Sequence, residues 1–222
     1  MREVVLDTET TGLDPASGDR IVEIGCVELI NHMPSGKTYH QYVNPQRDMP
    51  EGAFRVHGLS EAFLSEYPGF ADIAETFLEF IGDDPLVIHN ASFDMGFINS
   101  ELNRISRERL PISRSVDTVQ MARTKFPGAQ ASLDALCRRF EVDNSSRDKH
   151  GALLDAELLA EVYLQLIGGR QPDLELASEK KKRAVKSAVR IKRPPRPYAA
   201  SEAERAANDA LVERLANSIW RK

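Results

Sequence analysis

The stretch VVLDTETTGL, residues 4–13, decides how the rest of the chain is interpreted. Residues 3–7 are apolar enough for a short buried strand, and Asp7 and Glu9 stand at its end. Side chains two residues apart in an extended chain point to the same side, so these carboxylates would converge. A bound cation would offset their repulsion, and oxygen ligands suit hard ions such as Mg²⁺ or Mn²⁺. A solvated turn is the alternative, because Asp, Thr and Gly are common in turns.

The chain up to Gly169 alternates between strand and helix patterns. Apolar and β-branched runs predict strands, and apolar residues at helical spacing predict helices. The expected strands are 20–30, 37–43, 85–90 and 114–118, and the expected helices are 71–81, 92–105, 118–125, 132–140 and 152–167. Gly168 and Gly169 are a strong stop signal for the last helix. Three strands followed by alternating helices and strands predict an α/β domain with a mixed sheet.

Two more acids stand where predicted elements meet. Asp94 falls in the first turn of the helix expected at 92–105, where interaction with the helix dipole would by itself explain an acid. Asp155 follows His150 by five residues, at the start of the helix expected at 152–167. A lone histidine in that place is more often a surface or capping residue. The full set of four acids and a histidine, each beside an apolar element, needs a common reason, and metal binding provides one.

Charge is distributed unevenly. The chain has a net charge of −5, but residues 178–197 contain nine Lys or Arg and one acid, and residues 198–222 are neutral, so residues 1–177 carry −13. An acidic body cannot hold DNA through a broad basic surface, which normally supplies non-specific affinity. A nucleic-acid enzyme of this composition must bind weakly on its own or hold phosphates locally through metal ions.

The chain shows no pattern typical of export or membrane insertion. No apolar run reaches the roughly 18 residues of a membrane span, and the N-terminus lacks the regions of a signal peptide. Cys26 and Cys137 lie in apolar contexts that favour buried, reduced thiols, with a disulfide as the alternative. These features predict a cytosolic protein.

The pattern changes after Gly169. Residues 170–200 are rich in Lys, Arg and Pro and cannot bury enough apolar surface to fold, so they predict a flexible basic linker. Residues 201–222 return to a helical pattern, although an isolated helix of this length is marginal in water. The predicted organisation is a domain at 1–169, a linker and a helical tail.

Six stretches of the chain resemble the DEDD exonuclease superfamily, in the branch with a histidine in its last motif. They are similar in particular to the family of proofreading epsilon subunits of bacterial DNA polymerase III. The stretches are VLDTETTGLDP (5–15), RIVEIGCVEL (20–29), FRVHGLS (54–60), LVIHNASFDMGF (86–97), FPGAQASLDALCRRFEVDNSSR (126–147) and HGALLDAELLAEVYL (150–164). The resemblance implies a ribonuclease-H-like fold, with a mixed five-stranded sheet flanked by helices. It also implies a 3′→5′ exonuclease that removes mispaired nucleotides from DNA 3′ ends.

The resemblance further implies a role for each member of the catalytic set. Asp7 would bridge two divalent ions, Mg²⁺ or Mn²⁺, which stabilise the attacking and leaving oxygens of a phosphoryl displacement. Glu9 and Asp155 would complete the site of the attacking water, and Asp94 would hold the second ion, partly through water. His150 would accept a proton from that water, since a histidine with an ordinary pKa of about 6.5 is available in its neutral form.

Contacts with the substrate are also implied. His57 matches a position that touches the terminal nucleotide. Gly52 matches one where relatives often carry a side chain, so only its main chain could make the contact, and a simple turn is the alternative. Thr10 and Phe93 would flank the terminal base and sugar, unless Phe93 belongs to the core, while His89 is expected to pack or cap. The predicted substrate-binding residues are Asp7, Glu9, Gly52, His57 and Asp155.

The tail looks like the polymerase-binding tail of the same family, with a looser similarity. We expect residues 201–222 to form an amphipathic helix on the catalytic (alpha) subunit of the polymerase, with anchors at Leu211, Leu215, Ile219 and Trp220. The residues Gln171, Leu174 and Leu176 resemble a sliding-clamp motif of a kind that often occurs by chance. Tethering would raise the local concentration at DNA to about millimolar without strong DNA affinity.

Two other functions fit parts of the sequence. An RNA-trimming exonuclease of the same superfamily would use the same catalytic set, because the chemistry is at phosphate. It would not need the linker and tail. An inactive replisome adaptor would have no use for a repulsive cluster of acids, and the cluster is intact in this chain: Asp7, Glu9, Asp94, His150 and Asp155.

Overall fold

The computed structural model describes residues 1–145, 149–169 and 199–214. The chain divides into two compact units, Met1–Leu176 and Ala177–Lys222. In its described residues, the first unit holds a five-stranded sheet and seven α-helices. Within the same ranges, no helix has the length and apolar character needed to cross a membrane.

The sheet is mixed, which confirms the predicted fold class. Its strand order is β3-β2-β1-β4-β5, from β1 (Arg2–Thr10), β2 (Ile21–Ile30), β3 (Met33–Tyr42), β4 (Leu86–Ile88) and β5 (Ser115–Asp117). The first three strands pair antiparallel, whereas β4 lies parallel to both β1 and β5. β1 continues to Thr10, three residues past its predicted end, because its pairing with β2 reaches Ile21. Asp7 and Glu9 therefore stand within the central strand.

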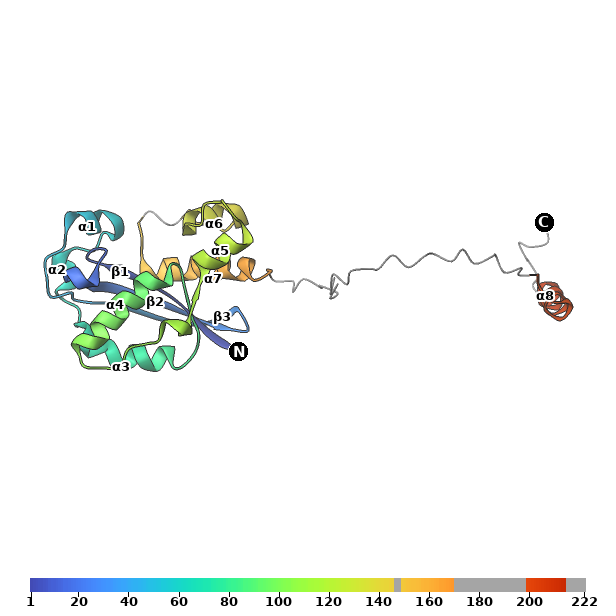
Figure 1. Cartoon of the computed structure of the whole chain (residues 1–222), viewed down its shortest axis with the longest axis horizontal. Helices are drawn as coiled ribbons and strands as arrows, with labels where there is room; N and C mark the ends of the chain where they lie inside the picture. The colour runs from blue at the N-terminus through green and yellow to red at the C-terminus, as the bar shows by residue number, and fades with distance from the viewer. Residues whose placement is uncertain (146–148, 170–198, 215–222) are drawn as a thin grey trace, which may run out of the picture. The chain divides into compact units, whose positions relative to one another are not determined.

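Two hydrophobic clusters pack on the two sides of this sheet. Val4 and Leu6 belong to one cluster and Val5 to the other, because side chains alternate along a strand. Cys26 and Cys137 are both buried, one in each cluster. The first side is covered by α3 (Phe70–Ile81) and α4 (Ala91–Arg104), and the second by α5 (Thr118–Lys125), α6 (Leu133–Phe140) and α7 (Ala152–Leu166) (Figure 1).

The start of α7 lies directly against the sheet. A Cβ atom on Gly25 of β2 would stand 2.2 Å from the backbone carbonyl carbon of Ala152, a distance that real Cβ atoms essentially never show. Gly25 pairs with Asp7 across the ladder. The absence of a side chain at Gly25 thus allows the first turn of α7, which carries Asp155, to approach the acids of β1.

Two short helices after β3 are not predicted by the sequence pattern. They are α1 (Glu51–His57) and α2 (Glu61–Leu64). The N-cap of α1 is Pro50, which makes no side-chain cap hydrogen bond, and His57 is its one buried residue. A short helix without a cap or an apolar stripe has almost no sequence signal. The described part of the first unit also contains two 3-10 turns, Pro15–Ser17 and Ile112–Arg114.

The described part of the second unit is α8 (Glu202–Arg214). No described residue of α8 is buried, and Leu211 is 56% exposed. The other predicted partner contacts lie outside the described residues, as does the basic run of the linker. Those contacts are Gln171, Leu174, Leu176, Leu215, Ile219 and Trp220. The division into segments 1–169, 170–200 and 201–222 stays a prediction.

Candidate active site

The five residues of the predicted catalytic set line one cavity of about 310 Å³. They arrive from three separate parts of the chain: the end of β1, the first turn of α4, and the loop and first turn of α7. Glu9, Asp94 and Asp155 are buried, whereas the side chain of His150 is about half exposed. The cavity wall also includes Thr8, His89, Phe93, Ser132, Leu133 and Asp134. We call it the carboxylate cavity.

Asp94 reaches from α4 across to β1. Its Oδ1 accepts a hydrogen bond from the Thr8 hydroxyl (2.7 Å) and another from the Thr8 backbone N–H (3.0 Å). Burial raises the pKa of Asp94 to about 7, and the Thr8 hydrogen bonds oppose this shift. Interaction with its own helix dipole therefore does not fully explain this acid, because its carboxylate is aimed at the neighbouring strand.

Asp155 and His150 meet at the start of α7. His150 Nδ1 lies 3.3 Å from Asp155 Oδ2, and Asp155 is 3% exposed. One ligand atom each from Glu9, His150 and Asp155 lies within 4.8 Å of the others. Carboxylate oxygens in a partly buried cluster are the donor set that hard divalent cations prefer, so the residues present fit such an ion.

A second cavity, of about 490 Å³, shares Thr8, Glu9 and Phe93 with the first. Its walls are mainly apolar and come from β1, the turn after it, and α1; they include Leu13, Pro50, Ala53 and Val56. The predicted contact residues Thr10, Gly52 and His57 also line it, so the structure gathers them beside the carboxylates. We call it the apolar cavity.

His57 lies in the wall of the apolar cavity and is buried, and its two ring nitrogens have different surroundings. Its Nδ1 accepts a hydrogen bond from the Leu59 backbone N–H (3.0 Å), which places the ring proton on Nε2. Nε2 has no hydrogen-bond partner of normal geometry among the described residues, although the Thr10 backbone lies near enough to raise the pKa of the ring. Burial lowers the pKa of His57, so the ring is neutral near pH 7. At Gly52 an added Cβ would meet nothing within 4 Å, so space does not require a glycine there.

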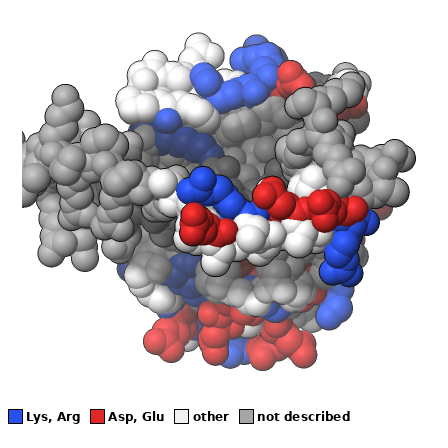
Figure 2. Space-filling view, turned by 90° about the vertical axis from the view of Figure 1, so that its right-hand side faces the viewer, with Lys and Arg blue, Asp and Glu red and all other residues white. Residues whose placement is uncertain are grey.

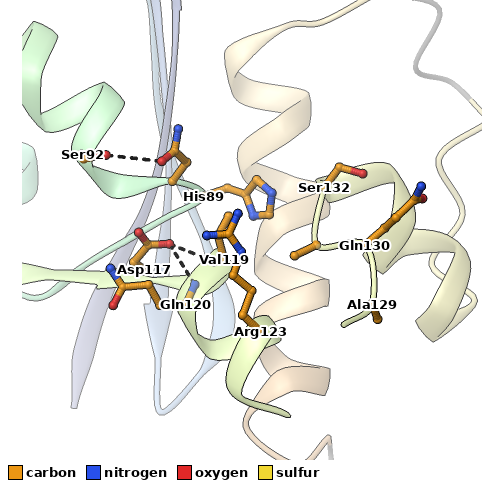
Figure 3. Close-up of a pocket in the computed structure, with 11 residues that line it drawn as sticks. His89, Ser92, Asp117, Val119, Gln120, Arg123, Ala129, Gln130 and Ser132 are labelled. Atoms are coloured by element: carbon orange, nitrogen blue, oxygen red, sulfur yellow. Dashed lines mark hydrogen bonds between the residues drawn. The ribbon is translucent and has the colours of Figure 1, made fainter. Parts of the chain in front are cut away.

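A third cavity, of about 650 Å³, shares His89 and Ser132 with the carboxylate cavity. It therefore adjoins a different part of the wall from the apolar cavity, which shares Thr8, Glu9 and Phe93. Figure 3 shows Arg123 extending from α5 toward His89, with Gln130 and Ser132 across the space. Asp117 lines it too, but its carboxylate accepts from the backbone N–H groups of Val119 and Gln120. We call it the polar cavity.

His89 Nδ1 lies 2.9 Å from the Thr118 hydroxyl, and His89 also lines the carboxylate and polar cavities, so the expectation that it packs or caps stays a prediction. Sequence reasoning missed several wall residues, among them Asp134 and Arg123. Asp134 lies in the first turn of α6 and lines the carboxylate cavity, while Arg123 lines the polar cavity. In the sequence, each is an ordinary charged residue near a helix end. Only the family resemblance of the SLDAL stretch could have drawn attention to Asp134. On the face shown in Figure 2, Lys and Arg are interspersed with Asp and Glu, without one broad basic surface.

Comparison with known proteins places this geometry in a family. Residues 4–163 match the family described as exonuclease (RNase_T). The chain is 54% identical to the DNA polymerase III subunit epsilon of Rickettsia felis over 182 residues, covering 81% of this chain and 80% of that protein. It is 41% identical to the subunit of the same name from Escherichia coli K12 over 238 residues, covering 99% and 97%.

Solved structures share the fold. Exonuclease X, in complex with 5′ overhanging duplex DNA, matches with a TM-score of 0.59 and 25% identity, over 74% of this chain and 90% of that one. The nuclease domain of 3′hExo, a DEDDh family member bound to rAMP, matches with a TM-score of 0.66 and 17% identity, over 75% and 91%. The chain therefore belongs to the exonuclease family and, within it, to the epsilon subunits of DNA polymerase III.

Proposed function

We propose that this chain is the proofreading exonuclease of a replicative DNA polymerase, which removes mispaired nucleotides from DNA 3′ ends by hydrolysis in the 3′→5′ direction. The observation that carries the proposal is the convergence of Asp7, Glu9, Asp94, Asp155 and His150 on one cavity. The relatives named as epsilon subunits of DNA polymerase III supply the biological setting.

The four carboxylates would hold two divalent ions, Mg²⁺ or Mn²⁺. Asp7, Glu9, Asp94 and Asp155 would be their ligands, since all four line the carboxylate cavity. Such ions neutralise the phosphate and stabilise the attacking and leaving oxygens. Burial already disfavours the charged form of Asp94, whose pKa is raised to about 7, so a nearby cation would keep it ionised.

His150 is the general base in this proposal. Its side chain stands at the cavity, about half exposed, with Nδ1 beside the Asp155 carboxylate. Asp155 orients the imidazole ring, and the ring accepts the proton of the attacking water. Exposure to solvent lets the protonated ring lose that proton to bulk water before the next cycle.

The apolar cavity would take the 3′-terminal nucleotide. Phe93 and the aliphatic walls suit a base and sugar, and His57 Nε2 offers a buried hydrogen-bond donor. The polar cavity, on the other side of the carboxylates, would take the preceding part of the strand, with Arg123 and Gln130 toward its phosphates. The scissile phosphate would then lie between the two cavities, over the acids.

The tail would tether the enzyme to its partners. The similarity to the Escherichia coli epsilon subunit extends over 99% of this chain and thus reaches into residues 201–222. Residues 201–222 would bind the catalytic (alpha) subunit, and Gln171, Leu174 and Leu176 would bind the sliding clamp. Tethering at an effective concentration of about millimolar compensates for the acidic body. The enzyme would then work in the cytoplasm, at the replisome.

Strand-end labelling tests the proposal. The 5′-labelled DNA should shorten stepwise, and 3′-labelled DNA should release its label at once, only when Mg²⁺ or Mn²⁺ is present. His150→Ala should slow both by at least about 100-fold, since general-base catalysis contributes about that much. RNA ends degraded as fast as matched DNA ends would favour an RNA-trimming enzyme instead. Unchanged hydrolysis after Asp7→Ala or chelation would remove the active site proposed here.

Deletion of residues 170–222 tests whether hydrolysis and polymerase binding belong to separate parts of the chain. Activity on free oligonucleotides should persist, because all of the cavity residues lie before residue 170. Co-purification with the polymerase should be lost. Loss of both properties would contradict a separate tether.

A further inference from the structure

The loop that carries His150 is attached to α1, the helix that forms one wall of the apolar cavity. The His150 backbone N–H donates to the Val56 carbonyl oxygen (3.2 Å). Val56 is in the last turn of α1, where carbonyl groups have no partner within the helix. His150, the proposed general base, and α1, one wall of the apolar cavity, are therefore joined through the main chain.

Lys149 adds a side-chain contact beside that hydrogen bond. Its ammonium nitrogen stands 5.3 Å from the centroid of the Phe54 ring, within cation–π range. Its side chain also fills the space over Gly58, where an added Cβ would lie 2.5 Å from Nζ and 2.7 Å from Cδ. Gly58 has a φ of +75°, the left-handed conformation that ends α1 and turns the chain toward this contact.

The contact lies off the nucleotide path. The α1 residues that line the apolar cavity are Gly52, Ala53, Val56 and His57, and neither Phe54 nor Lys149 lines it or the carboxylate cavity. Phe54 is 39% exposed, and Lys149 is exposed as well. A change at either residue therefore alters what holds the loop and leaves the walls of both cavities in place, although the Lys149 charge also helps to lower the pKa of His57.

We propose that Lys149 and Phe54 are positioning residues, whose contact fixes the His150 backbone on α1 and so sets the base relative to the nucleotide wall. The inference rests on the proposed function. It makes α1 a shared part of two operations, holding the terminal nucleotide and placing the group that accepts the proton. The base is then aligned by the helix that the substrate itself contacts.

Steady-state kinetics of the full chain test the inference, with Mg²⁺ and a 5′-labelled single-stranded oligonucleotide. Lys149→Met keeps the length of the side chain and removes its charge, and Phe54→Leu keeps an apolar side chain and removes the ring. Each should lower kcat by about two- to fivefold, the worth of an exposed cation–π contact. KM and inhibition by thymidine 5′-monophosphate, which report the apolar cavity, should stay unchanged in Phe54→Leu, which keeps the Lys149 charge near His57. Lys149→Arg should restore wild-type kcat.

Two comparisons sharpen the result. The double variant should be no slower than either single variant, because both remove the same contact. Arg55→Met is the control: Arg55 is exposed on α1, pairs only loosely with Glu51 (3.9 Å), and should change nothing.

Effects that multiply in the double variant, a change in KM in place of kcat, or wild-type kcat in both single variants would overturn the inference. A wild-type chain that does not shorten DNA from its 3′ end would instead overturn the proposed function. The two failures are therefore distinguishable in one set of assays.

Discussion

Buried acids in this protein fall into two groups that differ in what surrounds them. Glu101 is 2% exposed and receives two hydrogen bonds from the Arg20 guanidinium, at 2.6 and 2.8 Å. Glu28 is paired with Arg2 at 2.6 Å in the same way. In the carboxylate cavity, by contrast, five acids and two histidines share one wall, and the described residues of that wall include no Lys or Arg.

The difference indicates where charge compensation comes from. A buried carboxylate costs several kcal/mol unless it is paired, so Glu101 and Glu28 carry their cations as part of the fold. The acids of the carboxylate cavity instead converge on one another, and a cluster of carboxylate oxygens is a donor set that a bound divalent cation prefers. The first group is therefore expected to serve stability, and the second to serve function at some cost in stability.

The largest effect should follow from Asp7→Asn. Asparagine keeps the shape and removes the charge that would bridge two ions, so kcat should fall by at least about 1000-fold. Thermal unfolding without metal should be unchanged or shifted upward, because one of several repelling acids is neutralised. Oligonucleotide hydrolysis and calorimetry measure the two responses. A large loss of stability at unchanged activity would assign Asp7 to the first group.

Glu101→Gln should have the opposite profile. It leaves the Arg20 guanidinium without its carboxylate partner, and breaking a buried pair costs about 3–5 kcal/mol. Urea unfolding should show that loss, while kcat of the remaining folded enzyme stays within about twofold. Glu75→Gln is the control, since its ion pair with Arg107 is exposed and worth at most about 1 kcal/mol.

The pH dependence of Asp94 gives a smaller effect. Burial raises its pKa from 3.8 to about 7, so the folded state binds this proton more tightly than the unfolded chain does. That contribution to stability is complete below about pH 4 and is lost as the pH rises through 7. Metal-free wild type should therefore lose on the order of 1 kcal/mol or more between pH 4 and 7 relative to Asp94→Asn. Added Mg²⁺ should restore the lost stability. An equal change in the free energy of unfolding with pH in both proteins would contradict this account.

Arg123→Ala should have the smallest effect and should depend on substrate length. An exposed contact to a phosphate is worth about 1 kcal/mol, so kcat/KM on an oligonucleotide should fall about fivefold. The nitrophenyl ester of thymidine 5′-monophosphate has no preceding nucleotide, and its hydrolysis should be unaffected. Arg138→Ala, an exposed change on α6, is the control. Equal losses on both substrates would mean that the polar cavity does not hold the strand.

Local patterns predicted most of the regular structure. The helices at 71–81, 92–105, 118–125, 132–140 and 152–167 appear within one residue at either end, because apolar periodicity and end signals act over a few residues. Helix α1 was missed, since its seven residues carry neither a side-chain cap nor a buried stripe. Of the α1 residues in the wall of the apolar cavity, only Gly52 and His57 were consequently predicted.

By itself, the sequence predicted four of the acids that line the carboxylate cavity, because charged residues beside apolar elements need a compensating partner whatever the fold. It also predicted five of the helices and the mixed class of the sheet. Only the tertiary structure decided that Asp7, Asp94 and Asp155 share one cavity. It also decided that Gly25 lets α7 approach the sheet and that Lys149 contacts Phe54 of α1. These arrangements depend on contacts between residues far apart in the chain, and no local pattern encodes the distance between such residues.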